Sequence, residues 1–503
     1  MVRPMKAAKS FLFSLVSILA QSSGLAQSDD LAVKSQRAKV FMAQGRFAEA
    51  IPLYRELNQT VPNNPGLMLN LGMALHLAGD ERKAIPQLEG AVKLEAKLVP
   101  AWLFLGAARL QLGQTPAGLE ALKMVLHLQP DHRGALELLA GALLSLDRPA
   151  EAANQYQKLA EFDPESSAAW YGLGRSYESL SVRAFDELQK TAPESAYWLA
   201  LVADARLREQ QFSSGFYLYR HAVEKMPTMR SLHAAVAEIY RQTGHPDWAN
   251  VEEEKERQLP QPDCRTQTLE CEFQAGQYSG LVVSAQRANT PESYYWRSRA
   301  YNELALQAFT RLGRLPPSRE QHELKAHIYS GQKRYAEAAD EWRAARKFSP
   351  GDPQIQKQLA ISLKFSQDYG RALPLFQDLL RRRPGSAELS YLVGDTLLDL
   401  QRAEEAIPLL KRAVDRDPKL LAAHKSLARA DLAAGKAAEA IPHLKVALAT
   451  DEDGSLHYQL ARAYQTNGQP GLAEQVLADY QKIQGSAAAA REVSKREVEI
   501  TPP

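Results

Sequence analysis

Few side chains in this 503-residue sequence stand at spacings that support metal or nucleotide chemistry. His322 and His327 enclose a glutamate as in a zinc-protease helix, but they lie five residues apart, and two ligands on one helical face need four. The acidic run 451–454 suggests a calcium loop, yet Arg462 stands where a twelve-residue loop needs a bidentate acid. Residues 172–174 (Gly-Leu-Gly) follow no predicted strand and indicate helix packing. The sequence therefore predicts no cofactor and no metal site.

The composition excludes further classes of protein. Lys and Arg number 61 against 59 Asp and Glu, a formal net charge of +2, which argues against nucleic-acid binding through a basic surface. Charged residues make up 24% and hydrophobic residues 45%, as in ordinary folded proteins. Two cysteines are too few for a disulfide-dense scaffold or a Cys-rich zinc module.

The N-terminus has the order of a secretory signal peptide. Three basic residues precede an apolar run at 11–20, and Gly24 and Ala26 then occupy the −3 and −1 places. The run is shorter than the roughly 20 residues that cross a bilayer. We therefore expect residues 1–26 to be cleaved after Ala26 and the mature chain, without a membrane span, to be secreted across the inner membrane into a bacterial periplasm.

Cys264 and Cys271 could then form a disulfide, because an even pair in a secreted chain favours one. On a single straight helix, their Cα atoms would lie about 10.5 Å apart, beyond the roughly 7 Å that a disulfide spans. A bridge therefore requires Cys264 to lie in the loop after Pro260 and Pro262. Two packed thiols are the alternative.

Three classes of residue recur every 34 positions. They are Gly45, Gly79, Gly113 and Asp147; Ala50, Ala84, Gly118 and Ala152; and, near the other end, Pro350, Pro384 and Pro418. Within 99–132, an apolar stripe of helical spacing precedes Gly113 and a second follows it, ended by Pro130. Each unit is therefore predicted to be a pair of helices.

Two residue types have local roles in this pair. A small residue such as Gly106 lets two helices approach to the short end of the usual 8–10 Å separation. A recurrent proline, as at Pro52 and Pro86, is interpreted as lying in the first turn of the second helix, where the amide has no intrahelical partner.

This combination resembles the tetratricopeptide repeat family. The resemblance is carried by Leu71, Gly72, Ala84 and Leu88 in one unit, by Trp170, Leu173, Gly174 and Tyr177 in another, and by Tyr335, Ala338, Trp342, Ala345 and Pro350 in a third. It implies an all-α fold, a right-handed α-solenoid of about 14 helical hairpins. The predicted sections are an N-terminal array at 31–166, a divergent middle at 167–318, a C-terminal array at 319–487 and a flexible tail at 488–503.

The middle section contains two short units that resemble each other. Tyr177 matches Tyr301 and Phe185 matches Phe309, each pair 124 residues apart. Pro193 and Pro317 arrive early, which predicts a short second helix in each unit. Drift with a local bend is the favoured interpretation, and an older duplication is the alternative.

The resemblance also implies that the first helix of each unit lines a concave binding face. The early units would offer Leu69, Met73, Leu103, Leu110 and Leu144, and the later units Lys357, Lys364, Tyr391, Lys425, Arg429, Tyr458 and Arg462. The early groove would then hold an apolar segment and the late groove acidic groups. Alternatively, the apolar residues pack between adjacent units and the charges are solvated.

No segment of about 100 residues remains for a catalytic domain. The sequence therefore predicts a non-catalytic scaffold of the bacterial cell envelope that binds proteins or peptide segments. An accessory role in exopolysaccharide or outer-membrane export is the alternative. The identity of the partner and the oligomeric state are not encoded in any motif.

Overall fold

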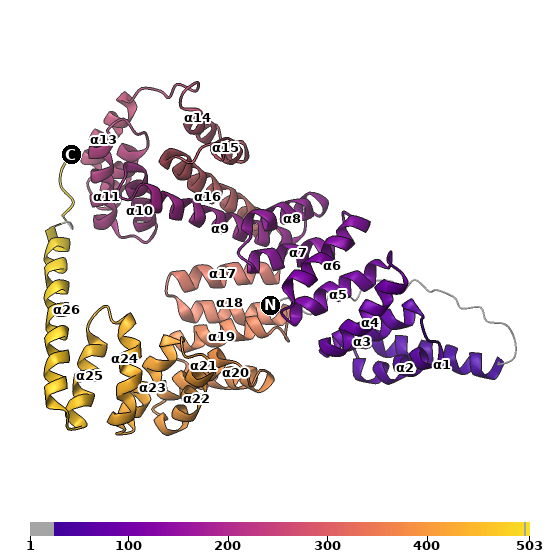
Figure 1. Ribbon diagram of the computed structural model, residues 1–503. Coiled ribbons are helices and arrows are strands. Elements are labelled where there is room, and N and C mark those ends of the chain that lie inside the picture. The colour runs from indigo at the N-terminus through magenta and orange to yellow at the C-terminus, as the bar shows by residue number, and fades with distance from the viewer. Residues whose placement is uncertain (1–24, 497–498) are drawn as a thin grey trace. The chain divides into compact units, whose positions relative to one another are not determined.

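The computed structural model describes residues 25–496 and 499–503 (Figure 1). This part of the chain contains 26 α-helices, one short 3₁₀ helix (Leu448–Thr450) and no strand, which confirms the predicted all-α class. Within the described ranges, no helix combines the length and the apolar character that a membrane crossing requires. The predicted signal peptide, 1–26, falls almost wholly outside these ranges.

The chain divides into two compact units. Unit 1 comprises the described residues up to Ala184 with 272–288 and 296–321, and unit 2 comprises 185–271, 289–295 and 322–503. Two long helices, α9 (Ser167–Thr191) and α16 (Pro291–Gly313), contribute residues to both units. The division at 166 and 318 that the sequence suggested stays a prediction.

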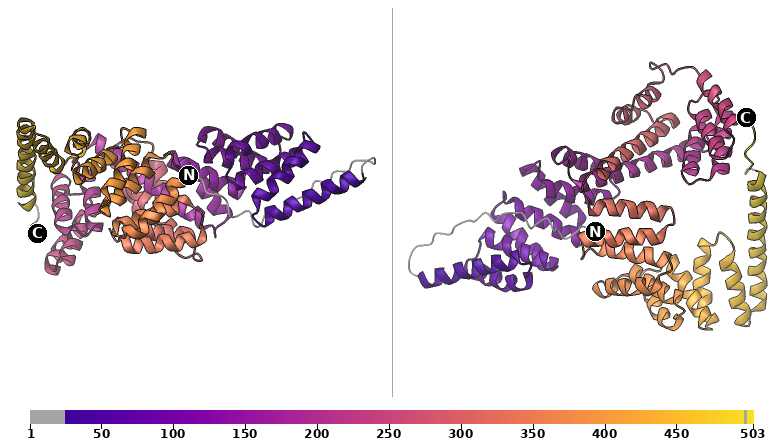
Figure 2. Two further views of the ribbon diagram at one scale, coloured as in Figure 1. Left: turned by 90° about the horizontal axis from the view of Figure 1, so that it is seen from below. Right: turned by 180° about the vertical axis from the view of Figure 1, so that it is seen from behind.

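Unit 1 begins with successive helix pairs, which Figures 1 and 2 show in chain order. They are α1 (Leu25–Ala43) with α2 (Phe47–Thr60), α3 (Pro65–Leu77) with α4 (Glu81–Leu94), α5 (Val99–Gln111) with α6 (Thr115–Leu128), and α7 (Arg133–Ser145) with α8 (Pro149–Phe162).

The repeated glycine marks the turn inside each pair. Gly79 and Gly113 have φ of +83° and +76°, and Asp147, which replaces glycine in the next unit, has φ of +56°. Glycine adopts this left-handed conformation at no steric cost, and aspartate tolerates it better than most residues. The 34-residue glycine frame is therefore a frame of helix–helix turns.

The second small residue permits close approach of the two helices. A Cβ atom on Gly72 would lie 2.6 Å from Leu88 Cγ, and one on Gly106 would lie 2.8 Å from Leu122 Cγ. Such distances are shorter than van der Waals contact, so any side chain there would push the pair apart. The predicted packing role of these glycines agrees with the structure.

The recurrent proline lies elsewhere than predicted. Helix α2 begins at Phe47 and α4 at Glu81, so Pro52 and Pro86 lie in the second helical turn, not the first. Proline there removes one backbone hydrogen bond from the helix. Pro52 is exposed, so water can reach the backbone carbonyl that loses its hydrogen bond there.

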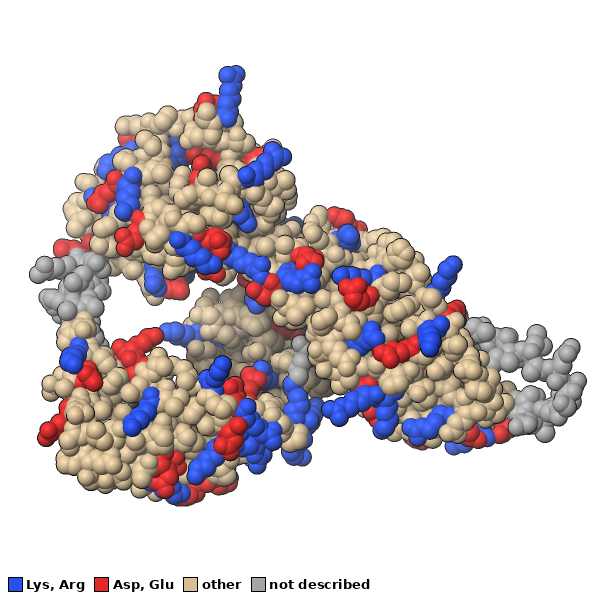
Figure 3. All heavy atoms as spheres, in the orientation of Figure 1, with Lys and Arg blue, Asp and Glu red and all other residues tan. Residues whose placement is uncertain are grey.

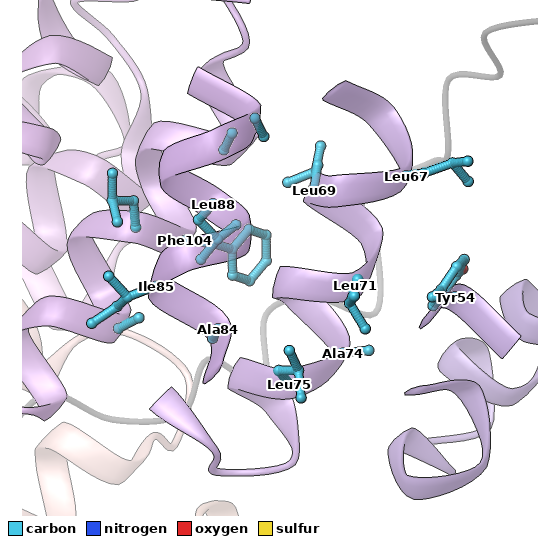
Figure 4. Packing of buried hydrophobic residues seen from close by; sticks show 14 of the residues in the cluster. Tyr54, Leu67, Leu69, Leu71, Ala74, Leu75, Ala84, Ile85, Leu88 and Phe104 are labelled. Atoms are coloured by element: carbon cyan, nitrogen blue, oxygen red, sulfur yellow. The ribbon is translucent and has the colours of Figure 1, made fainter. Parts of the chain in front are cut away.

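Adjacent pairs of unit 1 share one hydrophobic core. Tyr54 of α2, Leu71 of α3, Leu88 of α4 and Phe104 of α5 belong to a single cluster (Figure 4). Tyr54 and Leu88 are fully buried. Each helix thus covers apolar surface of its neighbours along the chain, as expected for stacked repeats.

The two short units of the middle section differ from the prediction. Each is one uninterrupted helix, α9 or α16, and not a hairpin with a short second helix. Within unit 1 they pack on each other: Ser181 Oγ donates a hydrogen bond to the Ser298 carbonyl at 2.9 Å, and the Tyr177 and Tyr301 rings stack with centroids 6.1 Å apart. The matching residues Tyr177 and Tyr301 are therefore direct partners.

Unit 2 consists of further helix pairs. They are α10 (Ala196–Arg208) with α11 (Phe212–Lys225), α12 (Leu232–Gln242) with α13 (Pro246–Gln258), α19 (Pro353–Phe365) with α20 (Tyr369–Arg382), α21 (Ala387–Asp399) with α22 (Ala403–Arg416), α23 (Leu421–Ala433) with α24 (Ala437–Ala447), and α25 (Ser455–Thr466) with α26 (Pro470–Arg496). The remaining helices are α18 (Tyr335–Phe348) in unit 2, α15 (Tyr278–Ala285) in unit 1, and α14 (Thr268–Gln274) and α17 (Arg319–Gly331), which have residues in both units.

Helix α26 continues into the segment predicted to be a flexible tail from 488. It ends at Arg496, and residues 499–503 follow without helical structure. The four alanines at 487–490 explain the continuation, because alanine has the highest helix propensity of all residues.

Candidate functional site

The candidate site is the first-helix face of the C-terminal array, meaning the predicted binding side chains on α19, α21, α23 and α25. Basic and acidic groups are intermixed on the side of the molecule that Figure 3 shows, so no broad field of one sign singles out a partner there. The contacts of individual side chains must therefore decide which of them are available.

One set of charges is already paired. Lys364 of α19 places its Nζ 2.8 Å from an oxygen of Asp395 and 2.8 Å from one of Asp399, both on α21. Arg429 of α23 approaches the other oxygens of the same aspartates at 3.2 Å and 2.9 Å. Ser426 also donates to Asp395, at 2.6 Å. We call these five residues the inter-repeat network, because they join the first helices of three successive pairs.

The electrostatics of the network are self-consistent. The Lys364, Asp395 and Asp399 side chains are only 11–16% exposed, and two cations face two carboxylates. Burial by itself would lower the pKa of Lys364, but the hydrogen bonds with Asp395 and Asp399 outweigh it and raise that pKa. The neighbouring Tyr391 has a raised pKa, first through burial and then through the charge of Asp395.

Three of the predicted basic residues make ion pairs within the chain. Lys364 and Arg429 hold Asp395 and Asp399, and Lys357 pairs with Glu388 of the next first helix at 2.9 Å. A partner carboxylate would have to displace an internal carboxylate from each cation, and breaking a half-buried pair costs more than a surface pair yields. These residues therefore join successive repeats, and their predicted role toward an acidic partner stays a prediction.

The open part of the face lies on α23 and α25. Lys425, Tyr458 and Arg462 are all exposed, Tyr458 to 46%. The hydrogen bonds from Ser455 lower the pKa of Asp453, and the charge of Lys425 lowers it further. The Tyr458 ring lies 5.7 Å from that of Tyr480 on α26. Two cations and an accessible phenol are thus presented by adjacent pairs.

The early apolar set does not form an open groove. Leu69, Leu103 and Leu110 are less than 10% exposed and belong to the hydrophobic clusters of unit 1. Met73 and Leu144 are half-buried against the same clusters. Leu110 shows the reason, since its side chain fills the space that Gly118 leaves in the second helix. These side chains pack within and between helix pairs, and their role in binding an apolar segment stays a prediction.

Sequence reasoning missed two acidic partners, Asp399 of the inter-repeat network and Glu388, which pairs with Lys357. Asp399 and Glu388 were absent from the predicted face, although each lies roughly one repeat after its basic partner: 31 residues after Lys357 for Glu388 and 35 after Lys364 for Asp399. A search for opposite charges one repeat apart on successive first helices would have found both pairs.

Cys264, in the loop after α13, forms a disulfide with Cys271 of α14. Their Cα atoms are 5.6 Å apart and the S–S distance is 2.10 Å. Cys264 precedes α14, which begins at Thr268, so the two residues are not on one helix. This is the geometry that the sequence required for a bridge.

The metal-like motifs have structural roles. His322 contacts Glu341 of α18 through Nδ1 at 2.6 Å. Asp451 accepts hydrogen bonds from the Leu456 and His457 amides at 3.1 Å and 2.9 Å, which caps the start of α25. Among the described residues, no group of three His, Cys, Asp or Glu could hold a metal ion.

Comparison with known proteins agrees with the helical pairs. The chain is 30% identical over 110 residues to the peroxisomal targeting signal receptor of Eremothecium gossypii and 30% identical over 113 residues to that of Candida glabrata. Each match covers 22% of this chain and 19% of the receptor, so the chain spans about a fifth of these relatives.

Two solved structures illustrate the likeness. A tetratricopeptide repeat protein from Parabacteroides merdae is 14% identical, covering 67% of this chain and 99% of its own, with a TM-score of 0.32. A thermophilic protein of the same repeat type from Thermus thermophilus is 19% identical, covering 36% and 98%, with a TM-score of 0.29.

Family models give the assignment. One model, described as tetratricopeptide repeat, matches residues 103–167, 146–181 and 357–420, and a second with the same description matches 41–102. The chain therefore contains tetratricopeptide repeats at residues 41–181 and 357–420.

Proposed function

We propose that this chain is a non-catalytic scaffold that binds an acidic peptide segment of a partner protein on the open part of its first-helix face. Tetratricopeptide repeats generally mediate interactions between proteins. The observation that carries the proposal is the contrast along the face. Lys364 and Arg429 are ion-paired with aspartates, whereas Lys425 and Arg462, beside an exposed tyrosine, make no ion pair within the described ranges.

A charge-reversal experiment tests the open face. The double variant Lys425→Glu and Arg462→Glu should abolish binding of acidic peptides and of captured partners, because repulsion replaces two charge-assisted contacts. Arg412→Glu is the matched control, since Arg412 is exposed on the second helix α22. Both variants should melt like the parent chain. Unchanged peptide affinity in the double variant would place the binding surface elsewhere.

The proposed location is the bacterial cell envelope. The support is the signal-like order of residues 1–26 together with the Cys264–Cys271 bridge, because disulfides persist in oxidising compartments. Expression in a bacterial host should yield a periplasmic chain that begins at Gln27, and Ala26→Asp should block this processing. An intact N-terminus in the cytosol would contradict the proposal. The identity of the partners captured with the chain would distinguish two candidate roles, a general envelope scaffold and an accessory of exopolysaccharide or outer-membrane export.

A further inference from the structure

The C-terminal residues 499–503 contact a helix far away in the sequence. Tyr240 of α12 donates a hydrogen bond from Oη to the Thr501 carbonyl at 2.7 Å, and both residues belong to unit 2. Figure 1 and the rear view of Figure 2 both place the C-terminal end beside α11 and α13. Tyr240 is fully buried. It lies 261 residues before Thr501 in the sequence.

The surroundings of Tyr240 are aromatic. Its ring lies 5.5 Å from Phe216 of α11 and 5.5 Å from Trp248 of α13, in an edge-on arrangement with the indole. His245 stacks on Trp248 with ring centroids 4.0 Å apart. Burial raises the pKa of Tyr240, so the hydroxyl stays protonated near neutral pH and able to donate.

The chemistry of the tail fits such a surface. Thr501 precedes two prolines, Pro502 and Pro503, which restricts all three residues to extended conformations. An extended chain has no internal backbone hydrogen bonds, so the Thr501 carbonyl is available to an outside donor. Thr501, Pro502 and Pro503 are themselves exposed, so the hydrogen bond from Tyr240 is the contact that carries the inference. Extended proline-rich segments lose little conformational entropy on binding.

We propose that the Tyr240 hydroxyl, beside the aromatic side chains of α11–α13, is a binding site for an extended peptide that carries two consecutive prolines, and that residues 499–503 of the same chain occupy it. This site is separate from the first-helix face of α23 and α25. The tail then acts as an internal ligand with a high effective concentration, and an external peptide of the same kind competes with it.

Peptide binding to a shortened chain tests the proposal. A chain ending at residue 498 should bind a labelled peptide of residues 499–503 with saturation in fluorescence polarisation, while a peptide of scrambled order should not bind. The full chain should bind the labelled peptide at least about tenfold more weakly, because its own tail competes. Equal binding to the two chains, or none to the shortened chain, would overturn the proposal.

Removal of the Tyr240 hydroxyl group tests whether the peptide binds at this residue. Tyr240→Phe in the shortened chain keeps the aromatic packing and should weaken peptide binding about two- to tenfold, the usual effect of one hydrogen bond. Tyr219→Phe is the matched control, because buried Tyr219 donates to Asp204 instead. Equal losses in both variants would contradict a site at Tyr240. A full-length dimer that dissociates when 499–503 are removed would overturn occupation within one chain.

Discussion

Asp431 shows how one residue departs from its repeat. It stands in α23 where α21 has Leu397 and α19 has Leu363, each separated by 34 residues and each buried. Asp431 is 0% exposed, and neither carboxylate oxygen has a hydrogen-bond partner among the described residues. Burial raises the pKa of Asp431, and Lys411 opposes it. A carboxylate therefore replaces a leucine at a core position, which disfavours the folded state.

Asp431→Leu should stabilise unit 2 by about 1–3 kcal/mol, since it removes an unsatisfied buried acid. The raised folded-state pKa sets the sign of the pH dependence. The unfolded chain ionises first, so the parent loses stability as pH rises from about 3.8, and the advantage of the variant grows toward neutral pH. Urea unfolding at pH 4 and pH 7 measures both effects. Asp415→Leu, at an exposed position on α22, is the control, and an equal gain there would refute the explanation.

The pair of His424 on α23 and His443 on α24 is expected to make the stability of these two helices depend on pH. His424 Nε2 lies 3.1 Å from the Pro418 carbonyl and must donate to it, so His424 Nδ1 accepts from His443 Nδ1 at 3.0 Å. His424 is therefore the acceptor and His443 the donor in this contact. Burial, the neighbouring His424 and Lys411 lower the pKa of His443, while Asp415 opposes them.

Acid should weaken the packing of α23 against α24. Because the folded-state pKa of His443 is depressed, the unfolded chain binds the proton more readily, and stability falls as pH drops below about 6.5. His443→Asn keeps a donor but does not titrate, so its melting temperature should fall less between pH 7.5 and 5.5. Exposed His127→Asn is the control and should match the parent. Identical pH profiles for all three chains would rule out the histidine pair as the sensor.

At the scale of elements, the pairing of α9 with α16 depends on one glycine. A Cβ atom on Gly174 would lie 2.3 Å from the Phe309 ring. Gly174→Ala should destabilise unit 1 by about 1–3 kcal/mol, because overpacking outweighs the better helix propensity of alanine. Gly370→Ala in α20, where the added methyl meets open space, should be neutral or slightly stabilising. Thermal unfolding compares the two. A stable Gly174→Ala chain would mean that α9 and α16 are not tightly packed.

The sequence predicted elements better than their long-range pairing. Gly113 and its equivalents identified the turns because their left-handed φ demands glycine locally. After Tyr177, by contrast, residues 178–183 contain no glycine or proline, and α9 continues where a turn was expected. Helix α9 packs on α16, and the residues in contact are 124 positions apart in the sequence. Local periodicity carries no information on such a contact. The candidate site shows the same limit, because Lys364 and Arg429 were identified without Asp399, which lies about one repeat away from each.

For the whole molecule, the distribution of the core limits how far a local change extends. Leu122 belongs to a hydrophobic cluster of unit 1, whereas Trp342, Phe376 and Leu410 form another cluster within unit 2. Repeats contact mainly their neighbours, so stability is expected to vary along the chain rather than collapse in one step.

Leu122→Ala should therefore act locally. Leu122 is fully buried, and its truncation should cost about 2–5 kcal/mol through lost contacts and a cavity. Hydrogen exchange read by mass spectrometry should show faster exchange in peptides from 99–166 and unchanged exchange in peptides from 353–447. Leu410→Ala is the reciprocal control, because Leu410 fills the corresponding place against Gly394 in unit 2, and it should reverse the pattern. Equal acceleration of exchange in both regions by either variant would show instead that the chain unfolds as a single cooperative body, against the nearest-neighbour coupling expected of stacked helix pairs.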